Sequence, residues 1–294
     1  METCEICGSG ELVLAYRGNV RDGAFGNVRD EGQIFECKKC GIQRLAEPFC
    51  IPDSYYETEA YRKKLSQELD DSAFYRAHDE LQKHALQVVL PYNLRNKAIA
   101  DIGCGAGSFT DHVAGLTSSV VAVEPFYLYR KVLSNKGYRV YPYASDAVGN
   151  GEAVDFAVSL QVIEHVRDPV AFLSDIRRLV KDNGYLVVST PNRNDILMDL
   201  LPGAYPAFFY RVVHRWYYDA GSLSECAKRA GFVVDSVKYV HRYGLSNAFH
   251  WLRDRSPQGN LRLSGLEDCI DEMWKTYLQD RGKSDTIFAV LRAC

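Results

Sequence analysis

The sequence predicts an α/β fold, in which a doubly wound seven-stranded sheet carries a small N-terminal β module. Three observations support this prediction. Short apolar runs alternate with amphipathic segments from residue 98 to residue 292, a glycine-rich turn follows the first of these runs, and two Cys-x-x-Cys pairs lie near the N-terminus. The length of 294 residues allows a full core with a small appendage.

The composition is that of an ordinary globular protein, with 47% hydrophobic and 25% charged residues. No apolar run approaches the ~20 residues of a membrane span. The first ten residues contain neither a basic start nor an apolar stretch, so we expect no signal peptide and a cytoplasmic protein. The net charge of -3 argues against a large nucleic-acid-binding surface.

The predicted core alternates strands and helices. We expect strands near residues 98–102, 120–124, 138–142, 154–160, 184–190, 232–240 and 285–292, and helices near 108–115, 126–136, 169–181 and 222–230. Asp168 precedes Pro169 as an N-cap before the first helical position. Ser222-x-x-Glu225 reads as a capping box. In such sheets, ligands bind at the carboxyl ends of the strands.

The stretch from Ile99 to Gly107, IADIGCGAG, places an acid at a strand tip before a tight turn. Glycines at alternate positions, Gly103, Gly105 and Gly107, let the backbone turn sharply and let a ligand approach. A second apolar run ends in Glu124, whose carboxylate can accept from both hydroxyls of a ribose.

The spacing of the glycines and the charge of Asp101 indicate which ligand this turn binds. Dinucleotide-binding turns have the pattern G-x-G-x-x-G, whereas this turn reads G-x-G-x-G. Asp101 would repel a pyrophosphate, but it suits a ligand that carries an ammonium and a sulfonium. We therefore expect S-adenosylmethionine (SAM) as the cofactor, with a glycine turn of some other α/β domain as the alternative.

This pattern closely resembles motif I of the class I SAM-dependent methyltransferases. The resemblance implies a Rossmann-like sheet whose seventh strand runs antiparallel. The segment from Asp155 to Pro169, DFAVSLQVIEHVRDP, resembles the corresponding part of the ubiquinone-biosynthesis O-methyltransferases and of related sugar methyltransferases. The resemblance covers roughly residues 90–235.

The resemblance also implies roles for individual residues. Leu160 and Gln161, at the strand tip, would back the methionine part of the cofactor. Glu164 and His165 would face the methyl group. Asp146 matches the acid that accepts from the adenine amine.

We predict that His165 is the general base, because an imidazole with a pKa near about 6.5 can take a proton from a hydroxyl at neutral pH. Glu164 would position the acceptor, and His214 and His241 are the reserve candidates for the base. The alternative is that His165 caps the next helix or packs under a lid. The quinone enzymes hold a divalent ion with an acid three residues before the Glu-His pair. Gln161 stands there in this chain and is a weaker ligand, so the participation of Mg²⁺ stays open.

The first fifty residues are predicted to form a separate zinc-binding module. Each second cysteine of the two pairs is followed by glycine, and four such thiolates fit a closed, structural Zn²⁺ site: Cys4, Cys7, Cys37 and Cys40. Chance pairing, or an iron site with the same ligands, are the alternatives. Between the pairs lie Arg17, Arg21 and Arg29, which form either an anion-binding loop for a phosphate-bearing substrate or a solvated hairpin.

Residues 51–95 are expected to be a helical linker that covers the cofactor. Helices are predicted over 53–70, which is rich in tyrosine (Tyr55, Tyr56 and Tyr61), and over 72–90. In the latter, Tyr75, Arg76 and His78 either reach the ligands or are ordinary surface residues. Residues 96–294 would form the methyltransferase domain.

Two insertions, 191–219 and 241–283, interrupt this domain. The first is rich in aromatic side chains: Tyr205, Phe208, Phe209, Tyr210, Trp216, Tyr217 and Tyr218. As caps over the strand ends, the insertions would select the acceptor. The alternative is that they form the interface of a homodimer.

The expected function is SAM-dependent methylation of a hydroxyl on a small molecule, by preference a sugar, a nucleotide sugar or a surface-glycan precursor. A quinone-like or polyketide-like phenol is one alternative. A ribosomal RNA methyltransferase with a zinc knuckle and a cofactor-binding module without activity are the others. The turn from Ser159 to Val162 lacks the Asn/Asp-Pro-Pro-aromatic pattern of enzymes that methylate nucleobase amines, and no nucleic-acid partner is expected.

Overall fold

The protein is described by a computed structural model that covers residues 3–59 and 71–294. By contact, the chain divides into two compact units, which are described one at a time. The first combines residues 1–50, 190–222 and 237–288, and the second combines residues 51–189, 223–236 and 289–294. The first unit thus contains residues 1–50 together with both predicted insertions, 191–219 and 241–283.

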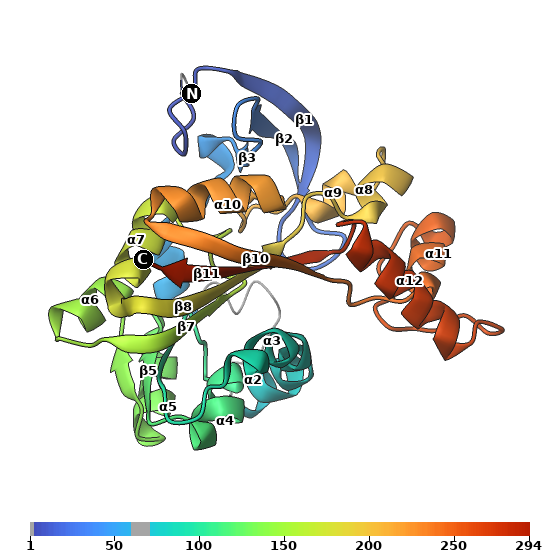
Figure 1. The fold of residues 1–294 in the computed structure, drawn as a ribbon. Helices are drawn as coiled ribbons and strands as arrows, with labels where there is room; N and C mark the ends of the chain where they lie inside the picture. The colour runs from blue at the N-terminus through green and yellow to red at the C-terminus, as the bar shows by residue number, and fades with distance from the viewer. Residues whose placement is uncertain (1–2, 60–70) are drawn as a thin grey trace. The chain divides into compact units, whose positions relative to one another are not determined.

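Seven strands form the larger sheet in the order β10-β11-β8-β7-β4-β5-β6. Their bounds are β4 (Ala98–Ile102), β5 (Ser119–Val123), β6 (Arg139–Tyr141), β7 (Val154–Leu160), β8 (Val180–Pro191), β10 (Phe232–Val240) and β11 (Thr286–Ala293). Parallel pairing joins β4 to β5 and β7, β5 to β6, and β7 to β8. Figure 1 shows β11 running against β8, so the sheet is mixed. The predicted fold class is therefore confirmed, and β8 begins four residues before its predicted start.

Helices of the second unit lie on both faces of its part of the sheet (Figure 1). They are α2 (Asp71–His78), α3 (Gln82–Val89), α4 (Ser108–Val113) and α5 (Tyr127–Asn135) on one face, and α6 (Ala144–Gly149) and α7 (Pro169–Leu179) on the other. The Asp168 carboxylate accepts from the Ala171 amide at 2.9 Å, so the predicted N-cap of α7 is confirmed.

Two predicted helices differ from the structure. The helix expected over 72–90 is broken by a 3-10 turn at Asp79–Leu81, where the Asp79 carboxylate accepts from the Ser108 hydroxyl. The helix expected over 53–70 begins as a short 3-10 helix, Asp53–Glu57. Its remainder from residue 60, Tyr61 included, lies outside the described residues.

The start of α10 (Ala220–Arg229) also differs, because it begins two residues before the predicted 222. Asp219 and Ser222 cap it reciprocally. The Ser222 amide donates to Asp219 Oδ1 at 2.8 Å, and the Asp219 amide donates to the Ser222 hydroxyl at 3.0 Å. The expected capping box at Ser222 and Glu225 was therefore placed one turn too late, because Asp219, a stronger acceptor, takes the cap position.

The first unit contains a four-stranded sheet, β1-β2-β3-β9. The long hairpin of β1 (Leu12–Arg21) and β2 (Val28–Cys37) continues into β3 (Gln43–Leu45), which pairs antiparallel with β9 (Trp216–Tyr217). Residues of the first insertion thus complete the N-terminal sheet. The aromatic side chains of β9 and of the residue after it are buried: Trp216, Tyr217 and Tyr218.

A partly buried ion-pair network reinforces this connection. Arg193 donates to Glu36 on β2 at 2.9 Å and to Asp219 at 2.7 Å. Burial alone would raise the pKa of Glu36, but donors from Lys38, Gln43 and Arg193 outweigh it and hold that pKa near 2. Short helices complete the unit: η1 (Glu47–Phe49), α8 (Ile196–Leu200), α9 (Pro206–Phe209), α11 (Leu245–Asp254) and α12 (Asp268–Asp280). Within the described ranges, no helix has the length and apolar character needed to cross a membrane.

Candidate functional site

The glycine turn after β4 has a backbone that only glycine adopts easily. The φ angles are +75° at Gly103, +57° at Gly105 and +93° at Gly107. A Cβ atom on Gly103 would lie 2.5 Å from Val162, and one on Gly105 would lie 2.5 Å from the ring of Phe74. Both conformation and space therefore require glycine at these positions.

Glu124 lies directly after β5 and is hydrogen-bonded to this turn. The Gly105 amide donates to its Oε2 at 2.8 Å, and the Phe126 amide donates to its Oε1 at 2.9 Å. The side chain is buried, with 6% of its surface exposed. These two bonds fix the orientation of the carboxylate beside the glycine turn.

Asp101 lies on β4 next to the last strand residue and is almost completely buried. The pKa of its carboxyl group is raised to about 7, because burial and, less strongly, the charges of Glu124 and Asp111 outweigh the hydrogen bond from Thr110, which lowers it. Thr110 Oγ1 donates to Asp101 Oδ2 at 2.6 Å. Thr110 was not identified from the sequence as a partner of Asp101. Thr110 lies in the first turn of α4, from which its hydroxyl reaches back to β4.

The α2 segment contacts the glycine turn, as expected of residues before it. Phe74 packs against Ala106, Phe126 and Tyr129. The Tyr75 hydroxyl donates to the Ala106 carbonyl at 2.7 Å, while the ring of His78 stacks on Phe74 at 4.1 Å between centroids. Of the three predicted ligand candidates, Tyr75 thus makes a hydrogen bond and His78 a stacking contact within this unit.

The segment after β7 contains the second group of predicted residues. Leu160 ends the strand, and Gln161 has a left-handed backbone with φ +58°. Its amide donates to the Ser189 carbonyl at 3.0 Å, and its side chain reaches the Ser189 hydroxyl at 3.3 Å. Gln161 is thereby held against the end of β8.

His165 and Glu164 follow this turn. The Tyr56 hydroxyl lies 3.0 Å from His165 Nδ1, and His165 Nε2 lies 3.9 Å from Glu164 Oε1. Glu164 is 1% exposed. The sequence drew attention to Tyr56 only as part of a tyrosine-rich stretch, because 109 residues separate it from His165.

The strand order brings most of the predicted cofactor residues to one edge. β7, β4, β5 and β6 are parallel neighbours, so their carboxyl ends meet there. Asp146 follows β6 in the first turn of α6, where its carboxylate accepts from the Tyr143 amide at 3.1 Å.

The two reserve histidines belong to the first unit. His214 is buried, and its ring centroid lies 6.1 Å from that of Tyr217. His241 Nδ1 accepts from the Asp285 amide at 3.1 Å. Burial lowers the pKa of His241, while the charge of Asp285 opposes this. Both histidines therefore have packing or hydrogen-bonding roles in the structure.

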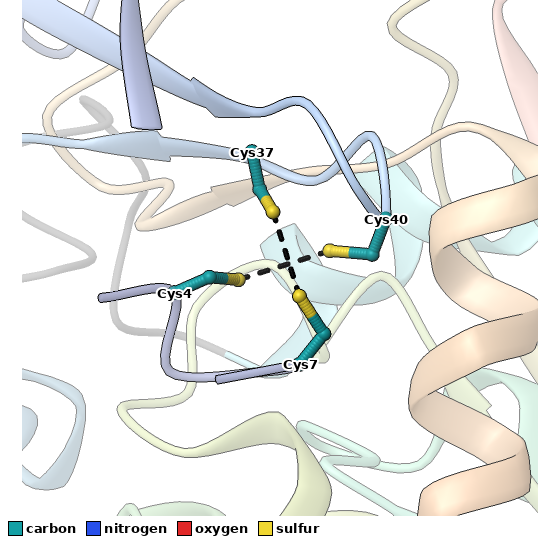
Figure 2. Close-up of side chains that lie close together, drawn as sticks. All are labelled: Cys4, Cys7, Cys37 and Cys40. Carbon is teal, nitrogen blue, oxygen red and sulfur yellow. Dashed lines mark hydrogen bonds between the residues drawn. The ribbon is translucent and has the colours of Figure 1, made fainter. Parts of the chain in front are cut away.

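The four cysteines of the N-terminal module form one cluster (Figure 2). The sulfur of Cys4 lies 3.7 Å from that of Cys40, the sulfur of Cys7 lies 3.5 Å from that of Cys37, and all four lie within 4.8 Å of one another. Zn–S bonds of about 2.3 Å in a tetrahedron place sulfurs about 3.8 Å apart, so the cluster has the size of a zinc site.

Local turns hold the thiols inward. Gly8 and Gly41, each directly after a second cysteine, have φ near the left-handed region at +73° and +74°. Burial opposes ionisation of Cys37, but the backbone amides of Cys40 and Lys39 outweigh it and bring the pKa of this thiol to about 7. A thiolate, the metal-binding form, is therefore accessible at neutral pH.

Comparison with known proteins identifies the family. Residues 73–237 match a family model described as "Methyltransferase domain", which is over half of the chain. The chain belongs to this methyltransferase domain family. The sequence resemblance to methyltransferases is thereby confirmed.

Curated relatives of the methyltransferase domain cover parts of the chain. The ubiquinone biosynthesis O-methyltransferase of Cereibacter sphaeroides is 32% identical over 111 residues, which is 35% of this chain and 45% of the relative. The enzyme of the same name from Aeromonas salmonicida is 27% identical over 176 residues, 53% and 71% of the two chains. A probable S-adenosylmethionine-dependent methyltransferase of Mycolicibacterium smegmatis is 26% identical over 185 residues, 60% and 66%. The chain spans about half the length of the first of these relatives.

Among solved structures, the magnesium protoporphyrin IX methyltransferase of Synechocystis PCC 6803 with bound SAH has a similar fold. The TM-score is 0.50 at 11% identity, over 82% of this chain and 97% of that one. This similarity concerns the fold alone.

The buried carboxyl of Asp101 generates a pH prediction. Its pKa is raised from 3.8 to about 7 in the folded chain, so the folded state binds the extra proton and stability falls as the pH rises between these values. About three pH units correspond to up to about 4 kcal/mol. We expect Asp101→Asn to unfold at a higher temperature than the wild type at pH 8, and at an equal temperature at pH 4. Thermal unfolding followed by circular dichroism measures this, with the exposed Asp182→Asn as control. Equal unfolding temperatures at pH 8 would contradict the burial argument.

Proposed function

We propose that the chain is a SAM-dependent methyltransferase that acts on a hydroxyl group of a small molecule. The observation that carries the proposal is the edge formed by Asp101, the glycine turn and Glu124 within the methyltransferase domain. When bound, SAM supplies an activated methyl group on a sulfonium. The residues of the edge suit its charges, because Asp101 offers a carboxylate to the ammonium group and Glu124 offers acceptors to the ribose.

Further residues of the edge complete the proposed cofactor site. A carboxylate can accept about four hydrogen bonds, so the backbone donors to Glu124 are compatible with ribose hydroxyls. Gly103, Gly105 and Gly107 allow the backbone to approach the ligand closely. Asp146 is proposed for the adenine amine, and Leu160 and Gln161 for the methionine part.

His165 is the proposed general base. In the tautomer that carries its proton on Nδ1, the ring donates to the Tyr56 hydroxyl 3.0 Å away and presents the lone pair of Nε2 for a substrate proton. Glu164, 3.9 Å from Nε2, then stabilises the imidazolium that forms. Tyr56 is thus a positioning residue that selects the tautomer.

Two acceptor classes follow from different features. We favour a sugar, a nucleotide sugar or a surface-glycan precursor, because three arginines lie on the β1–β2 hairpin. A quinone-like phenol is the second candidate, favoured by the names of the curated relatives. Incubation with SAM and a panel of nucleotide sugars and phenols separates them, since the acceptor gains about 14 mass units on methylation.

We further propose that the cysteine cluster holds one structural Zn²⁺. The donor set supports this, because four sulfurs at tetrahedral spacing leave no position for a substrate. The ion would cross-link the residues before β1 to the turn between β2 and β3.

The cofactor proposal predicts the effect of replacing Glu124. Glu124→Ala removes the proposed ribose acceptors and should weaken the binding of S-adenosylhomocysteine by about 2–4 kcal/mol, which calorimetry measures. Because Glu124 also binds two backbone amides, thermal unfolding must show that the variant is folded. Glu225→Ala, on the exposed pair with Arg229, is the control. If the folded Glu124→Ala variant binds S-adenosylhomocysteine with unchanged affinity, Glu124 does not bind the ribose.

The zinc proposal predicts one metal ion per chain and its loss in Cys4→Ser. Without zinc, amides of β1, β2 and β3 should exchange hydrogen faster, because metal binding and local folding are linked. Elemental analysis and hydrogen exchange measure the two effects, with the exposed Cys269→Ser as control. Protein purified without chelator that contains no zinc would refute the proposal.

The base assignment predicts that His165→Ala lowers turnover by ~10²–10⁴, with the affinity for S-adenosylhomocysteine nearly unchanged. Tyr56→Phe should lower turnover less and shift its pH profile, since the ring loses its tautomer-selecting partner. His214→Ala and His241→Ala are compared in the same assay. If one of these two variants loses turnover while His165→Ala retains it, the base lies in the first unit and the assignment is wrong.

A further inference from the structure

Arg21, the last residue of β1, is a buried charged side chain, and two of its three nitrogens lack a hydrogen-bond partner among the described residues. Only 8% of its surface is exposed. Its Nε and Nη2 atoms are inaccessible to solvent and have no hydrogen-bond partner within residues 3–59 and 71–294. The guanidinium carbon lies 3.9 Å from the centroid of the Phe208 ring. A buried cationic donor without a partner is costly, so this arrangement calls for an explanation.

The two atoms are the pair that a guanidinium uses for side-on recognition. Nε–H and Nη2–H point in nearly the same direction, in the plane of the group, and together match two oxygens of an anion. Stacking on Phe208 occupies one face of that plane, so the in-plane donors are the ones left for a ligand.

Arg211 adds a second guanidinium on the same side. Arg21 and Arg211 are partners in a parallel β-bridge, in which the Arg21 amide donates to the Tyr210 carbonyl at 2.8 Å and the Val212 amide donates to the Arg21 carbonyl at 3.0 Å. Paired residues of a bridge project to one face of the sheet. Burial lowers the pKa of Arg211 to about 10. No ion pair of its guanidinium occurs in the described part of the chain.

Three carboxylates of the same unit have partners of their own. Asp285 pairs with Arg242, and Asp22 pairs with Arg29 at 3.7 Å. Asp195 accepts from the Tyr205 hydroxyl at 2.8 Å and caps α8. None of these carboxylates forms an ion pair with Arg21 or Arg211 within the described ranges.

We propose that Arg21 and Arg211 bind a phosphate or diphosphate group of a small-molecule ligand. Two guanidinium charges match a doubly charged phosphoryl group better than a singly charged carboxylate. That this ligand is the methyl acceptor rests on the proposed function. Of the three arginines noted on the hairpin, only Arg21 qualifies, because Arg17 is exposed and Arg29 is paired.

Ligand entry requires a side chain to move, because the donor atoms are covered. Phe25 is the candidate: it is 52% exposed and packs on Phe208 with 6.0 Å between ring centroids. The rings of Phe208 and Trp251 lie 4.8 Å apart, so an apolar part of the ligand would find aromatic surface beside the phosphate.

The test uses the full-length, zinc-loaded chain and inorganic pyrophosphate as probe, titrated by calorimetry at constant ionic strength. Arg21→Met and Arg211→Met keep the length of the side chain and remove its charge. Arg17→Met is the matched control, on the same strand but exposed. We expect the wild type and Arg17→Met to bind alike, and the other two variants to bind about ten- to hundredfold more weakly.

Thermal unfolding shows whether the variants fold. Without pyrophosphate, Arg21→Met should unfold at the same temperature as the wild type or higher, because it removes an unpaired buried charge. With pyrophosphate, the unfolding temperature should rise for the wild type and Arg17→Met, and should rise much less for Arg21→Met and Arg211→Met. The proposal is overturned if the wild type does not bind the probe, or if folded Arg21→Met binds it equally well.

A parallel titration with S-adenosylhomocysteine separates this proposal from the proposed function. If the protein binds pyrophosphate but does not bind S-adenosylhomocysteine, the phosphate site is supported and the proposed methyltransferase function is refuted. If the protein binds S-adenosylhomocysteine but not pyrophosphate, only the phosphate-site proposal is refuted. If Arg21→Met raises KM for phosphorylated acceptors and leaves KM for unphosphorylated ones unchanged, the site belongs to the acceptor. If Arg21→Met has the same KM values as the wild type for both phosphorylated and unphosphorylated acceptors, the site does not bind the acceptor.

Discussion

The backbone of the turn between β4 and α4 is the constraint on which the larger sheet's functional edge depends. Three residues with positive φ reverse the chain within five positions, and neighbouring side chains fill the space where Cβ atoms would lie. Glu124 ties the end of β5 to this turn through the Gly105 amide. Because β4 and β5 are adjacent parallel strands, one carboxylate fixes both the turn and the neighbouring strand end, and the geometry of the edge is set before any ligand arrives.

The first unit depends on a different principle, since it is assembled from three stretches of chain. The hairpin alone buries little, because five of the ten residues of β1 and three of the ten residues of β2 are exposed. Its remaining partners come from the first insertion: β9 extends the sheet, Arg193 binds Glu36, and Phe208 stacks on Arg21. The aromatic residues that distinguish the insertion in the sequence are explained largely by this packing.

The fold could be predicted well because its signals are local. Apolar runs mark buried parallel strands, and Asp168-Pro169 caps a helix within four residues. The cysteine cluster was also predictable, since each pair brings its own turn. Contacts between distant stretches left no such signal. Tyr56 meets His165 across 109 residues, and the pairing of Arg21 with Arg211 depends on a two-residue bridge that no periodicity reveals. The misplaced start of α10 shows the remaining local ambiguity, because Asp219 and Ser222 are both good caps.

The pairing of β3 with β9 also sets an order of events during synthesis. It joins residues 43–44 to residues 216–217, and a ribosome adds about 5–20 residues per second. Roughly ten to thirty seconds therefore pass between the synthesis of the hairpin and the synthesis of β9, the strand that completes its sheet. During that interval β3 is an unpaired edge that invites association with other chains. All four clustered cysteines have already been made by then, so the zinc ion proposed for them would hold the hairpin in register until β9 emerges from the ribosome.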